Sequence, residues 1–276
     1  MPAFAVTDWD DAYANMPNIV GGEAYAEKWA KAAAAFRNGL PAGVKMQLDL
    51  AYAKADRCAY DRFEPAGAPK GVLIFIHGGY WMRFDKSFFS HLAAGALARG
   101  WAVAMPQYPL CPQVRVRDIS RRIAEAVQVI AAAQPGPIAL AGHSAGGHLA
   151  SRMLCEDMAL PAATRSRIRV VVSISGVHDL RPLLKTALNG TLRLDEAEAV
   201  AESPALLRPV TPCPVTCWVG ANERSEFVRQ NALLANIWRG LGVVSETVEE
   251  PDRHHFTVVE ALTDPGHPLT RMLTPE

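Results

Sequence analysis

The chain has 276 residues, half of them hydrophobic, which is enough to bury one sizeable core and lies at the upper end of what a single α/β domain holds. Its 28 basic and 28 acidic residues leave no net charge, so nothing in the composition would attract nucleic acid or an anionic membrane. We therefore expect one domain spanning 1–276, with a small molecule as its partner.

Cysteine usage and the first residues indicate the compartment. The five cysteines are scattered without a C-x-x-C pair, which is neither a disulfide framework nor a zinc pattern. Residues 1–11 are acidic and lack the apolar stretch of a signal peptide, and no run approaches the roughly 18 apolar residues of a membrane span. We expect a cytoplasmic protein without metal or cofactor.

The N-terminal stretch 9–38 has the pattern of a helical extension. Within 22–36, Tyr25, Trp29, Ala32 and Phe36 recur at helical spacing and form one stripe. The stripe suits packing onto the domain; the alternative is that it roofs a substrate pocket.

The rest of the chain alternates between strands and helices. The stretches 44–50 and 57–63 suit an antiparallel strand pair at a sheet edge. From residue 71 the pattern predicts a mostly parallel, doubly wound sheet with helices on both faces. Its expected strands are 71–76, 101–105, 137–141, 168–175, 214–220 and 243–248. Its expected helices are 86–99, 118–133, 146–158, 226–239 and 256–263. The proline-punctuated stretch 179–209 shows no strand and is expected to form a small helical cap.

The sequence Gly142-His143-Ser144-Ala145-Gly146 follows the apolar strand 137–141 and precedes a helix. This G-x-S-x-G pattern between strand and helix is that of a nucleophile elbow, a tight turn that exposes one serine hydroxyl. Ser144 is therefore the candidate nucleophile, and the amide of Ala145 is a candidate oxyanion donor.

A second glycine motif, His77-Gly78-Gly79-Tyr80-Trp81, follows the strand 71–76. Paired glycines after a strand allow backbone amides to turn towards a ligand, so Gly78 and Gly79 are candidates for the other half of an oxyanion hole. Tyr80 and Trp81 are candidates for binding an aryl substrate, with core packing as the alternative for both rings.

A serine nucleophile needs a base and an orienting acid, which follow it along the chain in this arrangement. We choose His255, just past the last strand, with His254 as its rival. Glu223, just past the strand 214–220, is our choice of acid, and Asp179 is the runner-up.

The chain resembles the kynurenine formamidase (arylformamidase) branch of the α/β-hydrolases, which is related to hormone-sensitive-lipase-like esterases. The matching segments lie in the same order along residues 9–272: His77–Trp81, Gly142–Leu149, Ser175–Leu183, Glu226–Gln230 and His255–Glu260. The resemblance implies an α/β-hydrolase fold, with nucleophile Ser144, base His255 and oxyanion donors Gly78, Gly79 and Ala145. It places the acid on Glu223, where these formamidases carry aspartate.

The resemblance also implies an activity. We expect a metal-independent serine hydrolase that cleaves an aryl formamide such as N-formyl-L-kynurenine to kynurenine and formate, a step of tryptophan breakdown. One alternative is a general carboxylesterase acting on short-chain esters. Another is a hydrolase-fold binding protein without turnover. An edge strand or the N-terminal helix could serve a homodimer.

Overall fold

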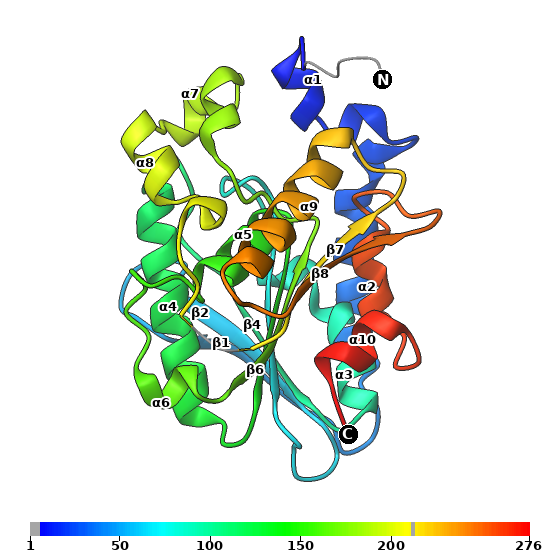
Figure 1. Ribbon diagram of the computed structural model, residues 1–276. Helices are drawn as coiled ribbons and strands as arrows, with labels where there is room; N and C mark the ends of the chain where they lie inside the picture. Colours follow the sequence, from blue (N-terminus) through cyan, green and yellow to red (C-terminus); the bar gives the residue numbers. More distant parts are fainter. Residues whose placement is uncertain (1–5, 211–212) are drawn as a thin grey trace.

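The computed structural model describes residues 6–210 and 213–276, which are built around an eight-stranded sheet (Figure 1). The strands lie in the order β1-β2-β4-β3-β5-β6-β7-β8. Their bounds are β1 (Lys45–Ala51), β2 (Ala59–Glu64), β3 (Val72–Ile76), β4 (Ala102–Pro106), β5 (Ile138–His143), β6 (Ile168–Ile174), β7 (Val215–Gly220) and β8 (Ser245–Glu250). The expected antiparallel pair forms one edge, since β1 pairs with β2 and β2 pairs with β4 in antiparallel register. All other neighbours are parallel.

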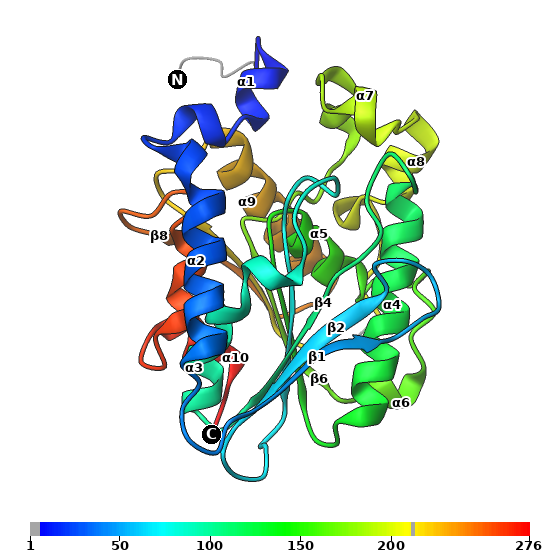
Figure 2. The same cartoon turned by 180° about the vertical axis from the view of Figure 1, so that it is seen from behind.

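Helices cover both faces of this sheet (Figures 1 and 2). The α-helices are α1 (Trp9–Tyr13), α2 (Tyr25–Asn38), α3 (Ala94–Ala98), α4 (Val116–Ala133), α5 (Ala145–Arg152), α6 (Ala162–Arg165), α7 (Asn189–Leu192), α8 (Glu196–Ala201), α9 (Ser225–Gly240) and α10 (Pro268–Leu273). Short 3₁₀ helices are η1 (Met16–Asn18), η2 (Gly22–Ala24), η3 (Lys86–Phe88), η4 (Ser90–Ala93), η5 (Arg181–Lys185), η6 (Pro204–Leu206) and η7 (Val258–Thr263).

Strand β3 shows why the sheet is covered on both sides. All five of its residues are buried, and alternate side chains enter different cores. Val72 and Ile74 belong to the core that contains residues of α4, α5 and α9. Leu73 and Phe75 belong to the core that contains residues of α2, α3 and α10. A continuous apolar run is therefore the pattern of a strand between two helical layers.

The expected helix 86–99 is wrong over most of its length. The chain there forms η3 and η4, and only α3 is α-helical. The guanidinium of Arg37 binds at this break, where its Nη1 donates to the Ser87 carbonyl at 2.6 Å and to Ser90 Oγ at 2.7 Å. In a regular α-helix that carbonyl would accept from the amide four residues later.

Several other predicted bounds also differ from the structure, and three of the differences concern the end of α5 and the C-terminal elements. Helix α5 ends at Arg152 instead of 158, because the amide of Glu156 donates to the Arg208 carbonyl and the amide of Val210 donates to the Leu154 carbonyl. The last strand starts two residues late, at Ser245. The expected helix 256–263 is the 3₁₀ helix η7, and α10 beyond it was not predicted.

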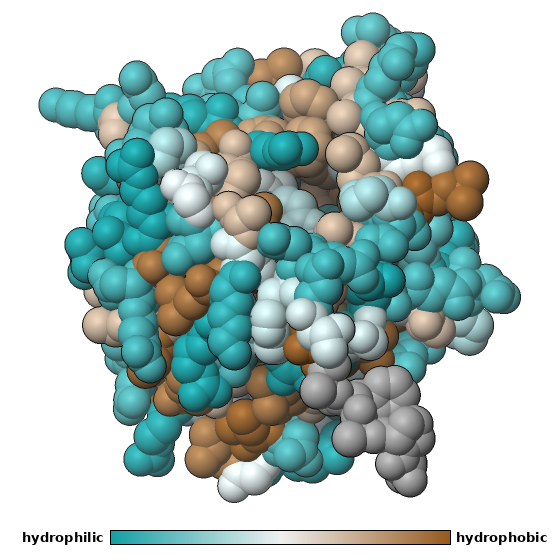
Figure 3. Space-filling view, turned by 90° about the horizontal axis from the view of Figure 1, so that it is seen from above, coloured by the Kyte–Doolittle hydropathy of each residue, from teal (hydrophilic) through white to brown (hydrophobic). Residues whose placement is uncertain are grey.

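The helix α1 and the segment 179–209 lie at the same end of the molecule, with α1 across from α7 and α8, while α2 runs down one side (Figures 1 and 2). The backbone amide of Ala187 donates to Asp10 Oδ1 at 2.5 Å, which joins the two segments. Viewed from this end, apolar side chains are recessed among hydrophilic ones (Figure 3). Within 6–210 and 213–276, no helix has both the length and the apolarity that crossing a membrane requires.

Candidate active site

Ser144 occupies the turn between β5 and α5. Its backbone has φ 55° and ψ −117°, a conformation that a non-glycine residue rarely adopts, and its side chain is buried. A Cβ atom on Gly142 would lie 2.0 Å from the Gly146 carbonyl oxygen, and one on Gly146 would lie 2.0 Å from the Ile76 oxygen. Both glycines are therefore required for the strand and the helix to meet closely enough to form this turn.

His255 and Glu223 form a tight, buried pair. The Nδ1 atom of His255 lies 2.6 Å from Oε2 of Glu223. The second carboxylate oxygen, Oε1, accepts from Ser175 Oγ at 2.5 Å and from the Gly220 amide at 2.8 Å. Both oxygens of Glu223 are thus held, and His255 Nε2 remains available for proton transfer.

The rival residues are engaged elsewhere. Asp179 binds Arg181 through both carboxylate oxygens, at 2.9 and 2.8 Å. Burial raises the pKa of Asp179, but its hydrogen bonds to Arg181 outweigh burial and hold it below the usual range. His254 Nε2 lies 3.3 Å from the Tyr25 hydroxyl, and His254 Nδ1 accepts from the Phe256 amide. The structure therefore brings Glu223, and not Asp179, to His255.

His143, the residue before the serine, is a part of the site that sequence reasoning missed. Its Nε2 lies 2.8 Å from the backbone oxygen of His255, and the two rings are 4.7 Å apart between centroids. Burial and then the charge of His255 lower the pKa of His143 well below its usual value. A neutral His143 therefore donates through Nε2. The signal in the sequence that could have indicated His143 is its position directly before the serine in the G-x-S-x-G motif.

The glycine loop after β3 lies directly beside the serine. A Cβ atom on Gly78 would lie 2.7 Å from the His143 oxygen and 3.1 Å from Ser144 Cβ. Gly79 has φ +112°, which favours glycine, and its carbonyl accepts from the amides of Met82 and Arg83. Across residues 6–210 and 213–276, the Gly78 and Gly79 amides have no protein acceptor. Ala145 opens α5, where amides lack an intrahelical partner.

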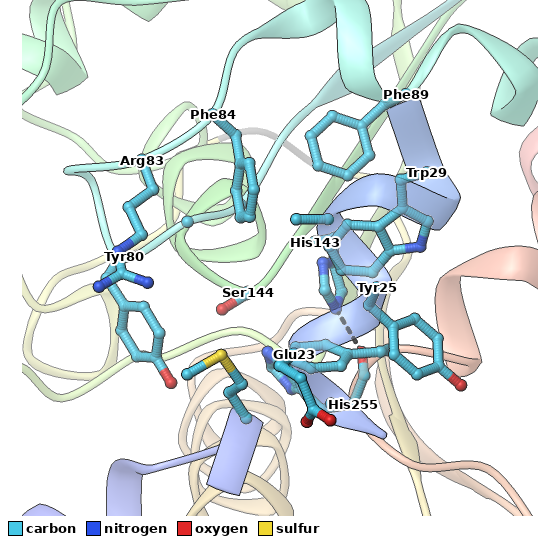
Figure 4. A pocket seen from close by; sticks show the side chains of 16 residues that line it. Glu23, Tyr25, Trp29, Tyr80, Arg83, Phe84, Phe89, His143, Ser144 and His255 are labelled. Carbon is cyan, nitrogen blue, oxygen red and sulfur yellow. Dashed lines mark hydrogen bonds between the residues drawn. The ribbon is translucent and has the colours of Figure 1, made fainter. Parts of the chain in front are cut away.

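Ser144 and His255 line one cavity of about 170 Å³ (Figure 4). Most of the other lining side chains are apolar or aromatic. The cavity is lined by Met16, Gly22, Glu23, Tyr25, Ala26, Trp29, Gly78, Gly79, Tyr80, Arg83, Phe84, Phe89, His143, Ser144, His255 and Phe256. An aromatic wall of this kind suits a compact, flat substrate group.

The two aromatic residues of the glycine loop have different surroundings. Tyr80 lines the cavity, and its hydroxyl donates to the Tyr13 carbonyl at 2.7 Å. Trp81 is fully buried behind the loop, with Nε1 lying 3.3 Å from His148 Nδ1, and it does not line the cavity. The assignment of Trp81 to substrate binding is therefore corrected to core packing.

The aromatic stripe of α2 serves both of the purposes considered for it. Trp29 is buried against Phe89 and Phe256, and its Nε1 donates to Glu260 at 3.0 Å. Trp29 and Tyr25 also line the cavity. The N-terminal extension thus supplies part of the cavity wall, a role that helical spacing alone could not distinguish from packing.

The cysteines are remote from this chemistry. All five are free and buried: Cys58, Cys111, Cys155, Cys213 and Cys217. Burial raises the pKa of Cys155 and Cys217 to about 12, so these thiols stay protonated. The described part of the chain contains no group of three or more His, Cys, Asp or Glu side chains that could hold a metal ion.

The fold and the serine elbow define a class of protein. A family model of the alpha/beta hydrolase fold matches residues 73–258, and the chain belongs to this family. The elbow, the glycine loop and the strands from β4 to β8 all lie in the matched region, so the chain is a hydrolase.

Two proteins of known name are similar to this chain over most of its length. The chain is 29% identical over 239 residues to the kynurenine formamidase of Danio rerio, covering 82% of this chain and 80% of that protein. It is 28% identical to the kynurenine formamidase of Salmo salar, with the same coverage. The resemblance seen in the sequence motifs is thereby confirmed.

Solved structures agree on the fold. A protein from Silicibacter sp. tm1040, provisionally described as a thioesterase, is 47% identical with a TM-score of 0.91, covering 97% of this chain and 99% of that one. Esterase B from Lactobacillus rhamnosis, at 20% identity and a TM-score of 0.67, covers 91% of each chain and shares the fold.

Proposed function

We propose that this hydrolase is a serine-dependent kynurenine formamidase, which releases formate from N-formyl-L-kynurenine. The observation that carries the proposal is the aromatic cavity beside Ser144, whose walls include Tyr25, Trp29 and Phe84. An aniline-type leaving group is a flat aryl ring, which such walls bind by stacking and edge contacts. The fish relatives named kynurenine formamidase support the same substrate.

In the first half of the reaction, Ser144 Oγ attacks the formyl carbon. As the O–C bond forms, His255 Nε2 takes the hydroxyl proton, and Glu223 stabilises the imidazolium through Nδ1. The carbonyl oxygen becomes an oxyanion, for which the amides of Gly78, Gly79 and Ala145 are available. The C–N bond then breaks, and the aniline nitrogen takes the proton from His255.

In the second half, water releases the formyl group. His255 accepts a proton from water while the water oxygen attacks the formyl carbon of the enzyme ester. The bond to Ser144 Oγ then breaks, the serine recovers its proton from His255, and formate leaves. Formyl is the smallest acyl group, which suits a cavity of only about 170 Å³ that must also admit the aryl ring.

Cleavage of a thioester or a short carboxylic ester is the second candidate function. The protein from Silicibacter sp. tm1040 favours it, because this 47% identical structure is provisionally described as a thioesterase. The same serine chemistry cleaves amides, esters and thioesters, so the substrate is decided by the walls of the cavity.

The test compares matched substrates on the purified protein. Formate release from N-formyl-L-kynurenine is measured beside hydrolysis of acetanilide, p-nitrophenyl acetate and acetyl-coenzyme A, each with and without EDTA. We expect kcat/KM for the formamide to exceed that for the other amide and the thioester by at least about a hundredfold, and to survive the chelator. Ester cleavage alone does not discriminate, because the activated aryl ester is an easy substrate for any such serine.

Two results would contradict the proposal. Fast cleavage of acetyl-coenzyme A without formate release would assign the site to thioesters. Loss of formate release in EDTA, with recovery on adding a divalent metal, would contradict the metal-independent mechanism.

The free, buried cysteines support a cytoplasmic location for this reaction.

A further inference from the structure

The wall of the catalytic cavity, which is mostly apolar or aromatic, carries one charged side chain of each sign. Glu23 is the only carboxylate and Arg83 the only guanidinium among its described lining residues. Arg83 and Tyr80 stand on one side of Ser144, and Glu23 and Tyr25 stand on the other (Figure 4). The two opposite charges thus flank the reacting serine.

Both charged groups are available to a ligand. In the part of the chain that the structure describes, the side chains of Glu23 and Arg83 have no ion pair and no hydrogen bond. By contrast, the neighbouring Glu27 lies 2.5 Å from Lys31, and Arg57 donates to the backbone oxygens of Tyr108 and Phe84. Glu23 and Arg83 therefore have no partner within the described chain, whereas Glu27 forms an ion pair and Arg57 forms hydrogen bonds.

A second hollow adjoins the cavity at Arg83. This hollow of about 440 Å³ lies between α1, the glycine loop and the segment around Ala187. Met16, Tyr80 and Arg83 line both spaces, so they form the boundary between them. A substrate whose ring lies near Ser144 has room for a side chain beside Arg83.

We propose that Arg83 and Glu23 recognise the amino-acid tail of the substrate, with the α-carboxylate on Arg83 and the α-ammonium on Glu23. This inference rests on the proposed formamidase function and assigns the residues that bind the zwitterionic amino-acid part of its substrate. The guanidinium matches a carboxylate in a two-pronged geometry, and a carboxylate accepts from an ammonium group.

The chemistry of N-formyl-L-kynurenine fits this placement. Its amino-acid tail is attached to the ring position next to the formamide, so the tail starts beside the reacting group and carries both charges at its far end. With the formyl carbon at Ser144, the tail extends towards the rim of the same cavity. An uncharged ester or a simple formanilide has nothing for either residue to bind.

The experiment uses three formamides that differ only in the tail. N-formyl-L-kynurenine carries both charges, N-formylkynuramine carries only the ammonium, and 2-formamidoacetophenone carries neither. Values of kcat and KM are measured for the intact protein, Arg83→Gln and Glu23→Gln. The controls Glu27→Gln, in the first turn of α2, and Arg121→Gln, on the surface of α4, remove the same charges away from the cavity.

A distinct pattern is expected for each variant. Arg83→Gln lowers kcat/KM for N-formyl-L-kynurenine about 10-fold, mainly through KM, and leaves the other two formamides within about twofold. Glu23→Gln lowers kcat/KM about 5- to 10-fold for both substrates that carry the ammonium, and leaves 2-formamidoacetophenone unchanged. The two controls behave like the intact protein.

The failure of this inference is distinguishable from failure of the proposed function. One outcome is that the intact protein cleaves all three formamides while both variants retain its kcat/KM for each. In that case Arg83 and Glu23 do not bind the tail, and the proposed formamidase function is unaffected. Equal losses on all three substrates would also overturn the inference, because they indicate a general effect on the cavity. If the intact protein cleaves no formamide, the proposed function is wrong and the tail assignment is wrong with it.

Discussion

The Nε2 atom of His143 lies 2.8 Å from the backbone oxygen of His255, so the residue before the nucleophile holds the loop that carries the base. His143 belongs to β5 and is buried, whereas His255 lies in a loop beyond β8. The elbow therefore fixes Ser144 directly and His255 through this one hydrogen bond. The serine and its base share a support, which limits how far they can move apart.

We expect His143→Leu to lower kcat about 10-fold with little change in KM. The buried carbonyl of His255 loses its hydrogen-bond donor, and the imidazole ring of His255 shifts away from Ser144. His143→Gln keeps an amide donor of similar reach and should restore much of the loss. Steady-state kinetics on N-formyl-L-kynurenine check both. Equal losses in the two variants would show that ring packing matters and the hydrogen bond does not.

Ser144→Ala should lower kcat by roughly 10⁴- to 10⁶-fold, because no other group supplies the attacking oxygen. Ser151→Ala, two turns along α5, is the matched control, since its hydroxyl only donates to the Gly147 carbonyl. Formate release from both variants is the measurement. Turnover in Ser144→Ala near that of the intact protein would refute the serine mechanism and indicate another nucleophile.

Exchange of carboxylate for amide separates the two candidate acids. Glu223→Gln should cost about 10³- to 10⁴-fold in kcat, because an amide can no longer stabilise the imidazolium of His255. Asp179→Asn should change kcat less than about threefold, since Asp179 is bound to Arg181 and not to the base. Kinetics at pH 8 check the pair, and the reverse ranking would move the orienting role to Asp179.

Much of the site could be predicted because its parts are short-range patterns. At the glycines of the elbow and of the loop after β3, the neighbouring backbone lies too close for a Cβ atom. These positions therefore require glycine, and the glycine pattern can be recognised in the sequence. Glu223 and His255 could be placed because the ends of parallel strands meet at one edge of the sheet.

The rest depends on contacts between distant segments. Nothing near Arg37 predicts that its guanidinium binds the Ser87 carbonyl at the break in the expected helix 86–99. The paired positions 80 and 81 are both aromatic, and only the tertiary structure separates cavity-lining Tyr80 from core Trp81. No sequence motif contains Glu23 or Arg83, and only the folded chain brings both to the cavity.

Tyr80 ties the N-terminal extension to the glycine loop. Its hydroxyl donates to the Tyr13 carbonyl at 2.7 Å and accepts from Asn15 Nδ2 at 3.0 Å. Tyr80→Phe should lower the free energy of unfolding by about 1 kcal/mol and raise KM, because the extension that supplies Tyr25 and Trp29 is less firmly held. Urea denaturation and kinetics test this, and unchanged KM with lower stability would limit the bond to a structural role.

Several buried histidines should make the fold sensitive to mild acid. Burial lowers the pKa of His77 to about 4 and that of His148 and His178 to about 3. These rings stay neutral in the folded chain and take up a proton near pH 6.5 once unfolded. As the pH falls below about 6.5, the unfolded state binds more protons, so stability decreases until the folded pKa values are reached.

The loss amounts to about 1.4 kcal/mol per pH unit for each such histidine, or roughly 4 kcal/mol between pH 7.5 and pH 5.5 for the three together. His178→Gln removes one titrating ring from a buried position where Nε2 lies 3.2 Å from Ser173 Oγ. Urea denaturation at the two pH values should therefore show a loss about 1.4 kcal/mol smaller in this variant than in the intact protein. Burial lowers the pKa of His178 in the folded chain, and this lowering is the source of the expected difference. An identical loss of stability in both proteins would show that His178 binds its proton as readily in the folded chain as in the unfolded one, and would contradict the prediction.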